Sequence, residues 1–431
     1  MAKYLSWNKI PKITPKSIEK IGGNSDLFDN QSPPYTVYGL GRSYGDVCLT
    51  ERGTLLLSRG LNEFINFDSV NGKIRCQAGT SLNEILQLVT QQGWFIPVVP
   101  GTRFVTIGGA VANDIHGKNN HKVGSFGNFV RKFELLRSDR ERVVCSKSNN
   151  EGLFHATIGG LGLTGIITWV EIDLIPITNN FINVEIEGFK LIDDYWDINK
   201  QLETDWDYTV AWLDCISGGS SIGRGIFHSG KHSSLETGLP KYRDIKITFP
   251  IELPFPLINS FYSRVINSMY YRSNLGRGTL IKHYQPFFFP LDSINYWNRA
   301  YGKKGFFQYQ CVFPPENSKA GVSQILEVIN KSNQNSYLGV LKSFGSIKPE
   351  GIISFPRPGT TITLDFPNKG DKTLSLFNEL DSIVRTLKGA LYPAKDARMS
   401  GEMFRLSFPR YDEFSQYIDP KFSSSFWERV N

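Results

Sequence analysis

The spacing of hydrophobic and polar positions predicts short strands and one capped helix near the start of the chain. Residues 33–60 alternate short apolar runs with glycines, which is typical of a strand, a turn and a second strand. Residues Ser81–Gln92 predict a helix, because Ser81 is suited to cap its N-terminus and Glu84 follows three residues later, as in a capping box. The apolar stripe of this helix consists of Ile85, Leu86 and Val89.

Two further patterns complete the first part of the chain. Lys132–Arg137 and Arg142–Ser146 predict a hairpin, since two strand-like runs flank a short polar segment. Gly165–Ile175 predicts a strand, because it is rich in β-branched residues and partly alternating. We assign residues 1–178 to a first domain.

Strands and helices alternate between about residue 180 and residue 380. The clearest strands are Phe181–Ile186, Thr209–Leu213, Gly305–Val312 and Thr361–Phe366, and the clearest helices are Ala320–Asn333 and Asp371–Leu387. This order predicts an antiparallel sheet with helices on one face, and hence a second domain over residues 179–388 in an α+β protein. We expect residues 389–431 to return to the first domain.

Composition restricts the class of protein. Of the 431 residues, 40% are hydrophobic and 21% are charged, as in a globular protein, and the net charge of +7 is too small to indicate nucleic-acid binding. The five cysteines are scattered and odd in number, which favours a reducing compartment, and no metal-ligand spacing is present. With no signal peptide and no transmembrane helix in the sequence, we expect a cytoplasmic location, with peripheral membrane contact as the open alternative.

Residues 241–290 differ from their surroundings. They hold seven Lys or Arg and only two Asp or Glu, with aromatic residues interleaved, among them Phe249, Phe255, Phe261, Tyr262, Tyr270 and Tyr271. Several prolines and the lack of a clean period predict loops or an irregular lid. Two interpretations stay open: a basic, aromatic flap that admits a lipid-linked phosphate at a membrane surface, or a structurally unimportant insertion.

Three glycine-rich segments carry the candidate chemistry: Tyr38–Asp46, Pro100–Lys118 and Ile158–Ile166. Glycine allows positive φ and close approach of the backbone to a ligand, and successive N–H groups in such a loop form an anion site. The second segment lacks the Gly-Lys-Ser/Thr of a P-loop, and no G-x-G-x-x-G follows a first strand. These segments therefore indicate a cofactor with a pyrophosphate and a flat ring, bound outside the usual nicotinamide-cofactor pattern.

The motifs GLGRSYGD, PGTRFVTIGGAVANDIHGKNNHKVGSFGNFV, IGGLGLTGI, YTVAWLD, FFQYQ and LYPAKDAR resemble those of the vanillyl-alcohol-oxidase-type flavoenzymes. The resemblance implies a two-subdomain, PCMH-type FAD-binding module followed by a substrate domain. The residues that it implies around FAD are Gly39, Gly41, Arg42, Ser43, Tyr44, Gly101, Thr102, Thr106, Gly109, Ala110, Asn113, His116, Gly117, Gly124, Ser125, Asn128, Gly162, Ile166 and Lys395. The first loop contains no histidine, and no cysteine lies near Lys395, so we expect FAD to be bound non-covalently.

Within this class, the motifs are most similar to the branch that oxidises the 2′-hydroxyl of a polyprenyl-phosphoryl-β-D-ribose, the first half of an epimerisation to arabinose. By this resemblance the sugar pocket contains Tyr44, Lys118, Trp212, Gln308, Gln310, Lys342 and Thr363. Lys395 would stabilise the negative charge of the reduced flavin. The hydroxyl proton needs an acceptor, and His116, Tyr44 and Lys395 are candidates that the sequence does not rank.

The resemblance also implies a partner, an NAD(P)H-dependent short-chain reductase that would complete the epimerisation. Thr363 stands where the resembling branch has a cysteine, which leaves the identity of the lipid-linked sugar open. Two other functions stay in view: an alditol or sugar-lactone oxidase that uses oxygen, and a flavin-binding scaffold without turnover.

Overall fold

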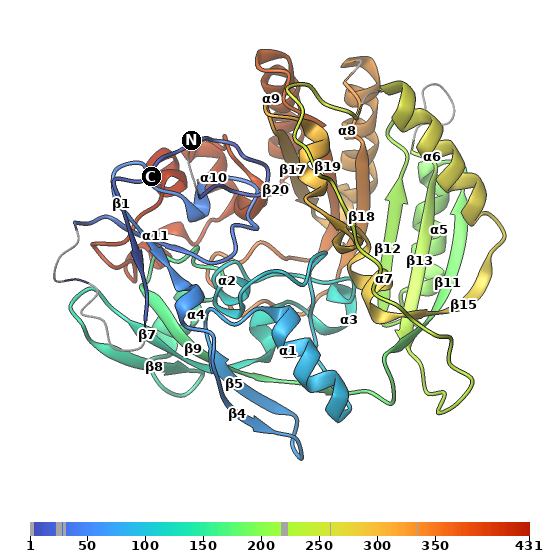
Figure 1. Ribbon diagram of the computed structural model, residues 1–431. Helices are drawn as coiled ribbons and strands as arrows, with labels where there is room; N and C mark the ends of the chain where they lie inside the picture. Colours follow the sequence, from blue (N-terminus) through green and yellow to red (C-terminus); the bar gives the residue numbers. More distant parts are fainter. Residues whose placement is uncertain (1–3, 23–27, 29–31, 217–222, 259, 333) are drawn as a thin grey trace.

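The computed structural model describes residues 4–22, 28, 32–216, 223–258, 260–332 and 334–431. Figure 1 shows two parts: a module at the left and bottom formed by the first 176 residues or so, and a large sheet with covering helices at the right. The C-terminal helices lie beside the N-terminal residues at the upper left, so the two ends of the chain are close together. The mixture of helices and largely antiparallel sheet confirms the α+β class.

The first part contains two sheets. A three-stranded parallel sheet has the order β1 (Ser17–Lys20), β3 (Thr54–Leu57), β2 (Tyr35–Tyr38), and a five-stranded antiparallel sheet has the order β4 (Phe64–Asp68), β5 (Lys73–Gln77), β9 (Ile166–Asp173), β7 (Val130–Leu136), β8 (Arg142–Ser146). The predicted hairpin and the strand Gly165–Ile175 are therefore confirmed. The strand-turn-strand prediction for residues 33–60 was wrong in its turn: β2 and β3 run parallel, so the chain needs a long connection, and residues 39–53 form it.

Helix α1 (Leu82–Val89) begins as the sequence predicts. The Ser81 hydroxyl accepts a hydrogen bond from the Glu84 N–H, and the Glu84 carboxylate accepts one from the Ser81 N–H, which completes the capping box. Its stripe of Ile85, Leu86 and Val89 is fully buried.

The second part is built on an eight-stranded antiparallel sheet. Its order is β15 (Gly278–His283), β11 (Phe181–Phe189), β13 (Gly225–His232), β12 (Tyr208–Leu213), β18 (Leu338–Phe344), β19 (Gly359–Pro367), β17 (Phe306–Phe313), β20 (Ala390–Leu391). All four strands predicted in this region are present, and the two predicted helices are α8 (Ser318–Ser332) and α9 (Asp371–Thr386).

Side chains alternate between the two faces of this sheet with the period of two that extended strands impose. On one side, Tyr309, Cys311, Ile362, Leu364 and Leu341 pack into a core with α8, α9 and α5 (Ile192–Leu202). The opposite side, which we call the polar face, carries Gln308, Gln310, Thr361, Thr363, Asp365, Lys342 and Trp212. This polar face meets the glycine-rich loops of the first part, since the Gln310 amide forms a hydrogen bond with His116 of the second loop.

The remaining short elements connect these two parts. The helices are α2 (Ile107–Ala112), α3 (Asn120–Val123), α4 (Glu151–Thr157), α7 (Tyr284–Phe288), α10 (Gly401–Ser407), α11 (Tyr411–Ser415) and α12 (Ser425–Val430), and the short strands are β6 (Trp94–Phe95), β10 (Ile175–Pro176), β14 (Ile247–Thr248) and β16 (Ile294–Asn295). Short 3-10 turns complete the set at Asp46–Cys48, Ser58–Gly60, Thr90–Gln92, Phe126–Phe129, Pro290–Ser293, Trp297–Tyr301, Pro315–Asn317 and Pro393–Lys395.

The prediction that residues 241–290 are irregular was wrong for the second half of that segment. Residues Ser260–Asn274 form helix α6, and β15 is the edge strand of the large sheet. Helix α6 has its polar side inward: Asn267 is 6% exposed and donates to the buried carboxylate of Asp214, whereas Ile266 and Met269 are 63% and 67% exposed. A search for a buried apolar stripe misses such a helix, because its apolar residues face outward.

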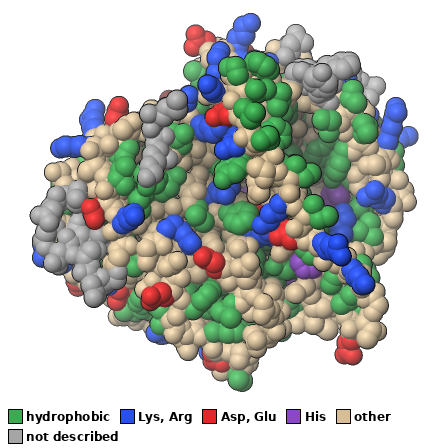
Figure 2. All heavy atoms as spheres, viewed as in Figure 1, with side chains coloured by type: hydrophobic (Ala, Val, Ile, Leu, Met, Phe, Trp, Pro, Cys, Tyr) green, Lys and Arg blue, Asp and Glu red, His purple; other side chains and the backbone are tan. Residues whose placement is uncertain are grey.

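Hydrophobic side chains lie open on the surface among Lys and Arg side chains in the view of Figure 2. In the segment before α6, the exposed apolar residues include Ile245, Ile247, Ile251 and Phe255. Within the described part of the chain, no helix has the length and hydropathy needed to cross a bilayer.

The end of the chain packs on the first part. The Arg429 guanidinium of α12 donates to the carboxylates of Asp46 and Asp396, at 2.7 and 3.3 Å. One of these carboxylates follows the first glycine-rich loop and the other adjoins Lys395. Arg429 thereby fixes two functional segments that are 350 residues apart in sequence.

The fully buried carboxylate of Asp114 fixes the second glycine-rich loop. It accepts hydrogen bonds from the Gly127 N–H at 2.8 Å, from the Ser125 hydroxyl at 2.8 Å and from the Ser354 hydroxyl at 2.6 Å. Ser354 precedes β19. The Asp114 side chain therefore joins its own loop to residues 125–127 and to the segment before β19, although no strand pairing or helix connects these three segments.

We expect Asp114→Ala to lower the free energy of unfolding by about 3 kcal/mol, because it leaves the buried Gly127 N–H without an acceptor and opens a small cavity. Chemical denaturation followed by circular dichroism measures this change. Asp173→Ala is the matched control: it removes an exposed ion pair with Arg131 and should cost less than about 1 kcal/mol. Equal losses in the two variants would contradict the role given to Asp114.

Candidate flavin and substrate site

The first glycine-rich loop, residues 39–46, connects β2 to the turn at Asp46–Cys48. No backbone carbonyl of the described residues accepts a hydrogen bond from the N–H groups of residues 40–43. Gly41 has φ of +62°, a conformation that favours glycine. Among the described residues these four successive N–H groups have no backbone acceptor, and such a donor set in one loop suits an anion.

This loop is packed tightly against the segment that carries Lys395. The Tyr44 N–H donates to the Ala394 carbonyl at 2.8 Å. A Cβ added to Gly45 would lie 1.6 Å from the Asp396 carbonyl oxygen, so only glycine allows this approach. The contact places the ring of Tyr44 under the Lys395 ammonium, with Nζ 3.7 Å from the ring centroid.

The second loop, residues 100–118, lies beside the first. Thr106 caps α2 by accepting a hydrogen bond from the Gly109 N–H at 3.2 Å, and its hydroxyl lies 2.6 Å from where a Gly39 Cβ would be. Gly101 and Gly162 both face open space, since a Cβ added to either meets nothing within 4 Å. The second loop and the turn at Gly162 thus leave room at these two glycines, whereas the glycines of the first loop are closely packed.

Other residues expected near FAD are placed less directly. Ala110 and Ile166 have fully buried side chains, so only their backbone is available to a ligand. The Asn113 amide donates to the Gly109 carbonyl at 2.9 Å, Ser125 bonds Asp114, and Asn128 closes a capping box with Ser125. Gly124, Gly117 and Thr102 belong to the same loops, and Thr102 accepts a hydrogen bond from the Phe104 N–H at 3.2 Å.

His116 joins the second loop to the polar face of the sheet. Its Nε2 accepts a hydrogen bond from the Gln310 amide at 3.0 Å, which leaves the proton on Nδ1. Burial and the charges of Lys342 and Lys395 hold the pKa of His116 well below its usual value, so the ring is neutral. Its Nδ1 is buried and has no partner among the described residues, as expected of a donor that awaits a ligand.

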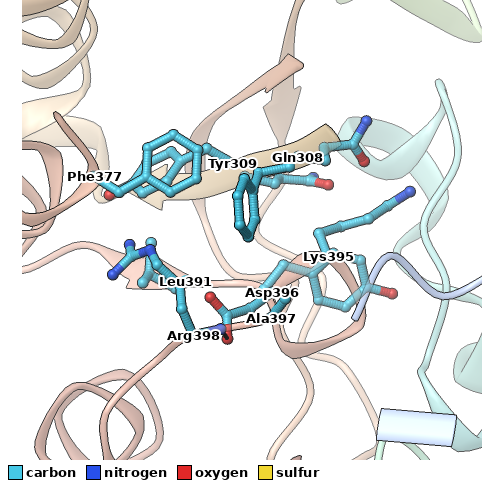
Figure 3. Close-up of a pocket in the computed structure, with 11 residues that line it drawn as sticks. Gln308, Tyr309, Phe377, Leu391, Lys395, Asp396, Ala397 and Arg398 are labelled. Atoms are coloured by element: carbon cyan, nitrogen blue, oxygen red, sulfur yellow. Dashed lines mark hydrogen bonds between the residues drawn. The ribbon is translucent and has the colours of Figure 1, made fainter. Parts of the chain in front are cut away.

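Lys395 and Gln308 extend toward the same side in Figure 3, whereas Asp396 and Arg398 extend the other way. The Gln308 amide donates to the carboxylate of Asp365, directly opposite it in the β17–β19 register. Burial, opposed by the Asp365 charge, lowers the pKa of Lys395, and burial raises the pKa of Asp365. Tyr44 keeps its proton, because burial raises the pKa of its hydroxyl well above the usual value.

Two further lysines lie near this group. Lys342 is on β18, opposite Thr361, and Lys118 ends the second loop, where its carbonyl accepts a hydrogen bond from the Thr209 N–H of β12 at 2.8 Å. The Lys118 ammonium donates to the Phe288 carbonyl at 3.2 Å. Burial lowers the pKa of Lys118 to about 7 and that of Lys342 to about 8, with Lys342 contributing to the lowering at Lys118.

The structure therefore brings together most of the side chains that the sequence analysis selected. Tyr44, Lys395 and Gln308 form one group, His116 and Gln310 a second, and Lys342, Thr363 and Trp212 lie on the same face. Asp365 is the residue that sequence reasoning missed. The alternation of Thr361, Thr363 and Asp365 in one strand was the signal that could have found it.

These residues fit FAD. The backbone donors of the first loop suit the pyrophosphate, the open space at Gly101 and Gly162 suits close approach of the cofactor, and Lys395 offers a cation of the kind that stabilises a reduced flavin. In the described part of the chain, no cluster of three or more His, Cys, Asp or Glu side chains could hold a metal ion.

Comparison with known proteins agrees with this geometry. The FAD binding domain family matches residues 12–146. A protein of Mycolicibacterium smegmatis named decaprenylphosphoryl-beta-D-ribose oxidase is 36% identical over 395 residues, which cover 89% of this chain and 85% of that protein. An uncharacterized protein of Streptomyces coelicolor is 28% identical over 79% of the chain and 96% of its own length.

Other relatives match a shorter part of this chain. D-lactate dehydrogenase of Anaerostipes hadrus is 30% identical over 187 residues, only 42% of this chain. The long match covers 89% of this chain, so the FAD cofactor and the oxidoreductase activity follow from it together with the family match. The chain belongs to the decaprenylphosphoryl-β-D-ribose oxidase family of FAD-dependent oxidoreductases.

Proposed function

We propose that the protein oxidises the 2′-hydroxyl of a polyprenyl-phosphoryl-β-D-ribose to the 2′-keto sugar. The observation that carries the proposal is the polar face, where two amides and Lys342 meet the glycine-rich loops and the Lys395 segment in a chain 36% identical to decaprenylphosphoryl-beta-D-ribose oxidase. Gln308 and Gln310 suit the hydroxyls of a sugar, and the lysines suit hydroxyls and a phosphate. FAD, when bound, supplies the acceptor for the hydride that leaves the 2′-carbon.

We further propose that the Lys395 amine accepts the hydroxyl proton. Tyr44 holds its own proton, and the Nε2 lone pair of His116 is used by Gln310, so neither accepts a proton readily. Burial lowers the pKa of Lys395, which makes the neutral amine accessible. The ammonium that forms would offset the negative charge that FAD, when bound, gains from the hydride, so one residue would serve as base and as counter-charge.

We propose two partners, a reductase that uses the product and a membrane that holds the lipid of the substrate. A keto sugar completes an epimerisation only if it is reduced again on the other face, so we propose an NAD(P)H-dependent short-chain reductase as the next enzyme. A polyprenyl chain is drawn from a bilayer, and we propose that the exposed apolar residues of segment 241–290, such as Ile247 and Ile266, make peripheral contact with it.

The substrate class is tested by anaerobic loss of flavin absorbance. We expect reduction by a polyprenyl-phosphoryl ribose and none by free alditols or sugar lactones, because only the first offers a phosphate to the lysines. Reduction by free polyols alone would assign the protein to the alditol oxidases. Reduction by neither, with FAD bound, would favour a scaffold without turnover.

Lys395→Met should slow flavin reduction by about 10³-fold, since it removes both the base and the charge. Lys395→Arg keeps the charge but accepts no proton near neutrality, so it should bind FAD and remain slow. Lys372→Met, on the exposed side of α9, is the control and should react normally. A fast Lys395→Arg variant would overturn the proton acceptor assignment.

The reaction rate should depend on pH in a defined direction. The acceptor must be deprotonated, so the rate constant of flavin reduction should fall as the pH drops below the lowered pKa of Lys395. Stopped-flow absorbance between pH 6 and about pH 10 measures this profile. A rate that rises on acidification would contradict the assignment.

Acid precipitation should release all of the yellow cofactor. The first loop offers Arg42 and Ser43 but no histidine, and all five thiols lie elsewhere than the Lys395 segment, so no side chain is placed for a covalent link. Absorbance at the flavin maximum in supernatant and pellet measures the partition, and colour retained by washed protein would refute non-covalent binding.

A further inference from the structure

The charges on and beside the polar face are unbalanced. Lys395, Lys342 and Lys118 lie together there, and among the described residues no carboxylate oxygen lies within 4.0 Å of any of their ammonium groups. Among the three lysines, the charge of Asp365 acts on Lys395, where it raises the pKa against the lowering caused by burial. Lys342 and Lys118 therefore share a partly buried region without a counter-ion.

Uncompensated cations in such a region are costly unless a ligand supplies the opposite charge. Burial is the main cause of the lowered pKa values of Lys118, His116 and His228, and neighbouring charges add to it: Lys342 acts on Lys118 and His116, and Lys282 and Lys118 act on His228. The structure nevertheless holds the Lys118 ammonium in place. Lys118 is held by the Phe288 carbonyl and lies over the Phe287 and Phe288 rings, at 5.6 and 5.9 Å from their centroids.

We infer that Lys118 and Lys342 together form a subsite for the phosphodiester of the substrate, separate from the sugar subsite at Gln308, Gln310 and Lys395. The inference rests on the proposed function and specifies how the substrate lies. Lys395 has Asp365 as its counter-charge and serves the reacting hydroxyl, whereas the other two lysines have none and serve the anion.

The strand order gives the direction of the bound molecule. Along the polar face, Gln310 on β17 pairs with Thr363 on β19, β18 with Lys342 comes next, and β12 with Trp212 follows. Adjacent strands are about 4.8 Å apart, so the backbones of β17 and β18, which flank β19, are separated by about two strand spacings. A sugar and its phosphate span a distance of this order when they lie across the strands.

In this arrangement the lipid chain of the bound substrate extends from the phosphate across β12 and β13. Trp212 on β12 contacts Tyr270 of α6 with ring centroids 4.8 Å apart, and His228 of β13 lies 3.2 Å from the Tyr270 hydroxyl. These side chains follow Lys342 in the strand order and offer aromatic surface to the first isoprene units. The outward apolar residues of α6 continue the same direction.

The subsite is tested by binding rather than turnover. Isothermal titration calorimetry of the holoenzyme would compare β-D-ribose 1-phosphate with methyl β-D-riboside, which lacks the anion. We expect Lys118→Met and Lys342→Met each to weaken binding of the phosphate probe at least tenfold and to change binding of the riboside less than twofold. Lys122→Met, which removes a surface lysine paired with Asp207, is the control and should change neither.

The pH dependence adds a second readout. Because the pKa values of Lys118 and Lys342 are about 7 and 8, binding of the phosphate probe at pH 8 should take up protons and should weaken as the pH rises to 9. The other titratable groups nearby are Lys395, Asp365, His116, His228 and Lys282. Loss of the proton uptake in both variants would tie it to this lysine pair.

Every outcome bears on the subsite. Equal weakening of both probes would make the lysines merely structural, and unchanged or undetectable binding of the phosphate probe would place the anion elsewhere. If the phosphate binds through the lysines but no polyprenyl-phosphoryl ribose reduces the flavin, the subsite stands and the proposed oxidation fails. If the flavin is reduced with undiminished affinity in both variants, the oxidation stands and the subsite fails.

Discussion

The alternation of side chains along β17, β18 and β19 is the constraint on which the rest of the structure depends. The same strands must bury Tyr309, Cys311 and Ile362 under α8 and α9 and present glutamines, threonines and a lysine on the reverse. A slip of one residue would exchange the two sets, so the apolar core fixes the register of the polar face. Stability and chemistry are thereby coupled in three strands, and a change that loosens the core also disturbs the site.

Two charged side chains, Asp114 and Arg429, hold the loops that face these strands. Asp114 joins the second loop to residues 125–127 and to Ser354, and Arg429 joins the first loop to the Lys395 segment. Glycine-rich loops have large conformational freedom when unfolded, so they need such anchors to present N–H groups in a fixed direction. The anchors come from distant parts of the chain, which explains why the C-terminal residues return to the first part.

The sequence was most informative where local pattern determines structure. The capping box at Ser81 and Glu84, the hairpin at Lys132–Ser146 and the strands of the large sheet follow from short-range rules, and the structure has them. The parallel pairing of β2 with β3 depends on a loop closed by distant contacts, and so it could not be read locally.

Helix α6 escaped prediction for a different reason, because its buried side is polar and is held by Asp214. The side-chain site was predictable mainly through motif resemblance. Asp365 was missed because its alternation with Thr361 and Thr363 marks the polar side of a strand but does not identify its partner, Gln308, which lies on another strand. Roles assigned to the glycines of the FAD loops remain those that resemblance implies, supported by the open space at Gly101 and Gly162 and by the donors of the first loop.

The distribution of thiols bears on inhibitor chemistry. Cys311 lies in β17 but packs into the apolar core, Thr363 lies on the polar face opposite Gln310, and burial raises the pKa of Cys48 to about 12. An electrophilic compound that enters along the polar face therefore meets a hydroxyl and amides instead of a thiolate. This protein should be intrinsically insensitive to warheads that depend on cysteine alkylation or mixed-sulfur adducts, while remaining open to reversible ligands that use the same amides and lysines.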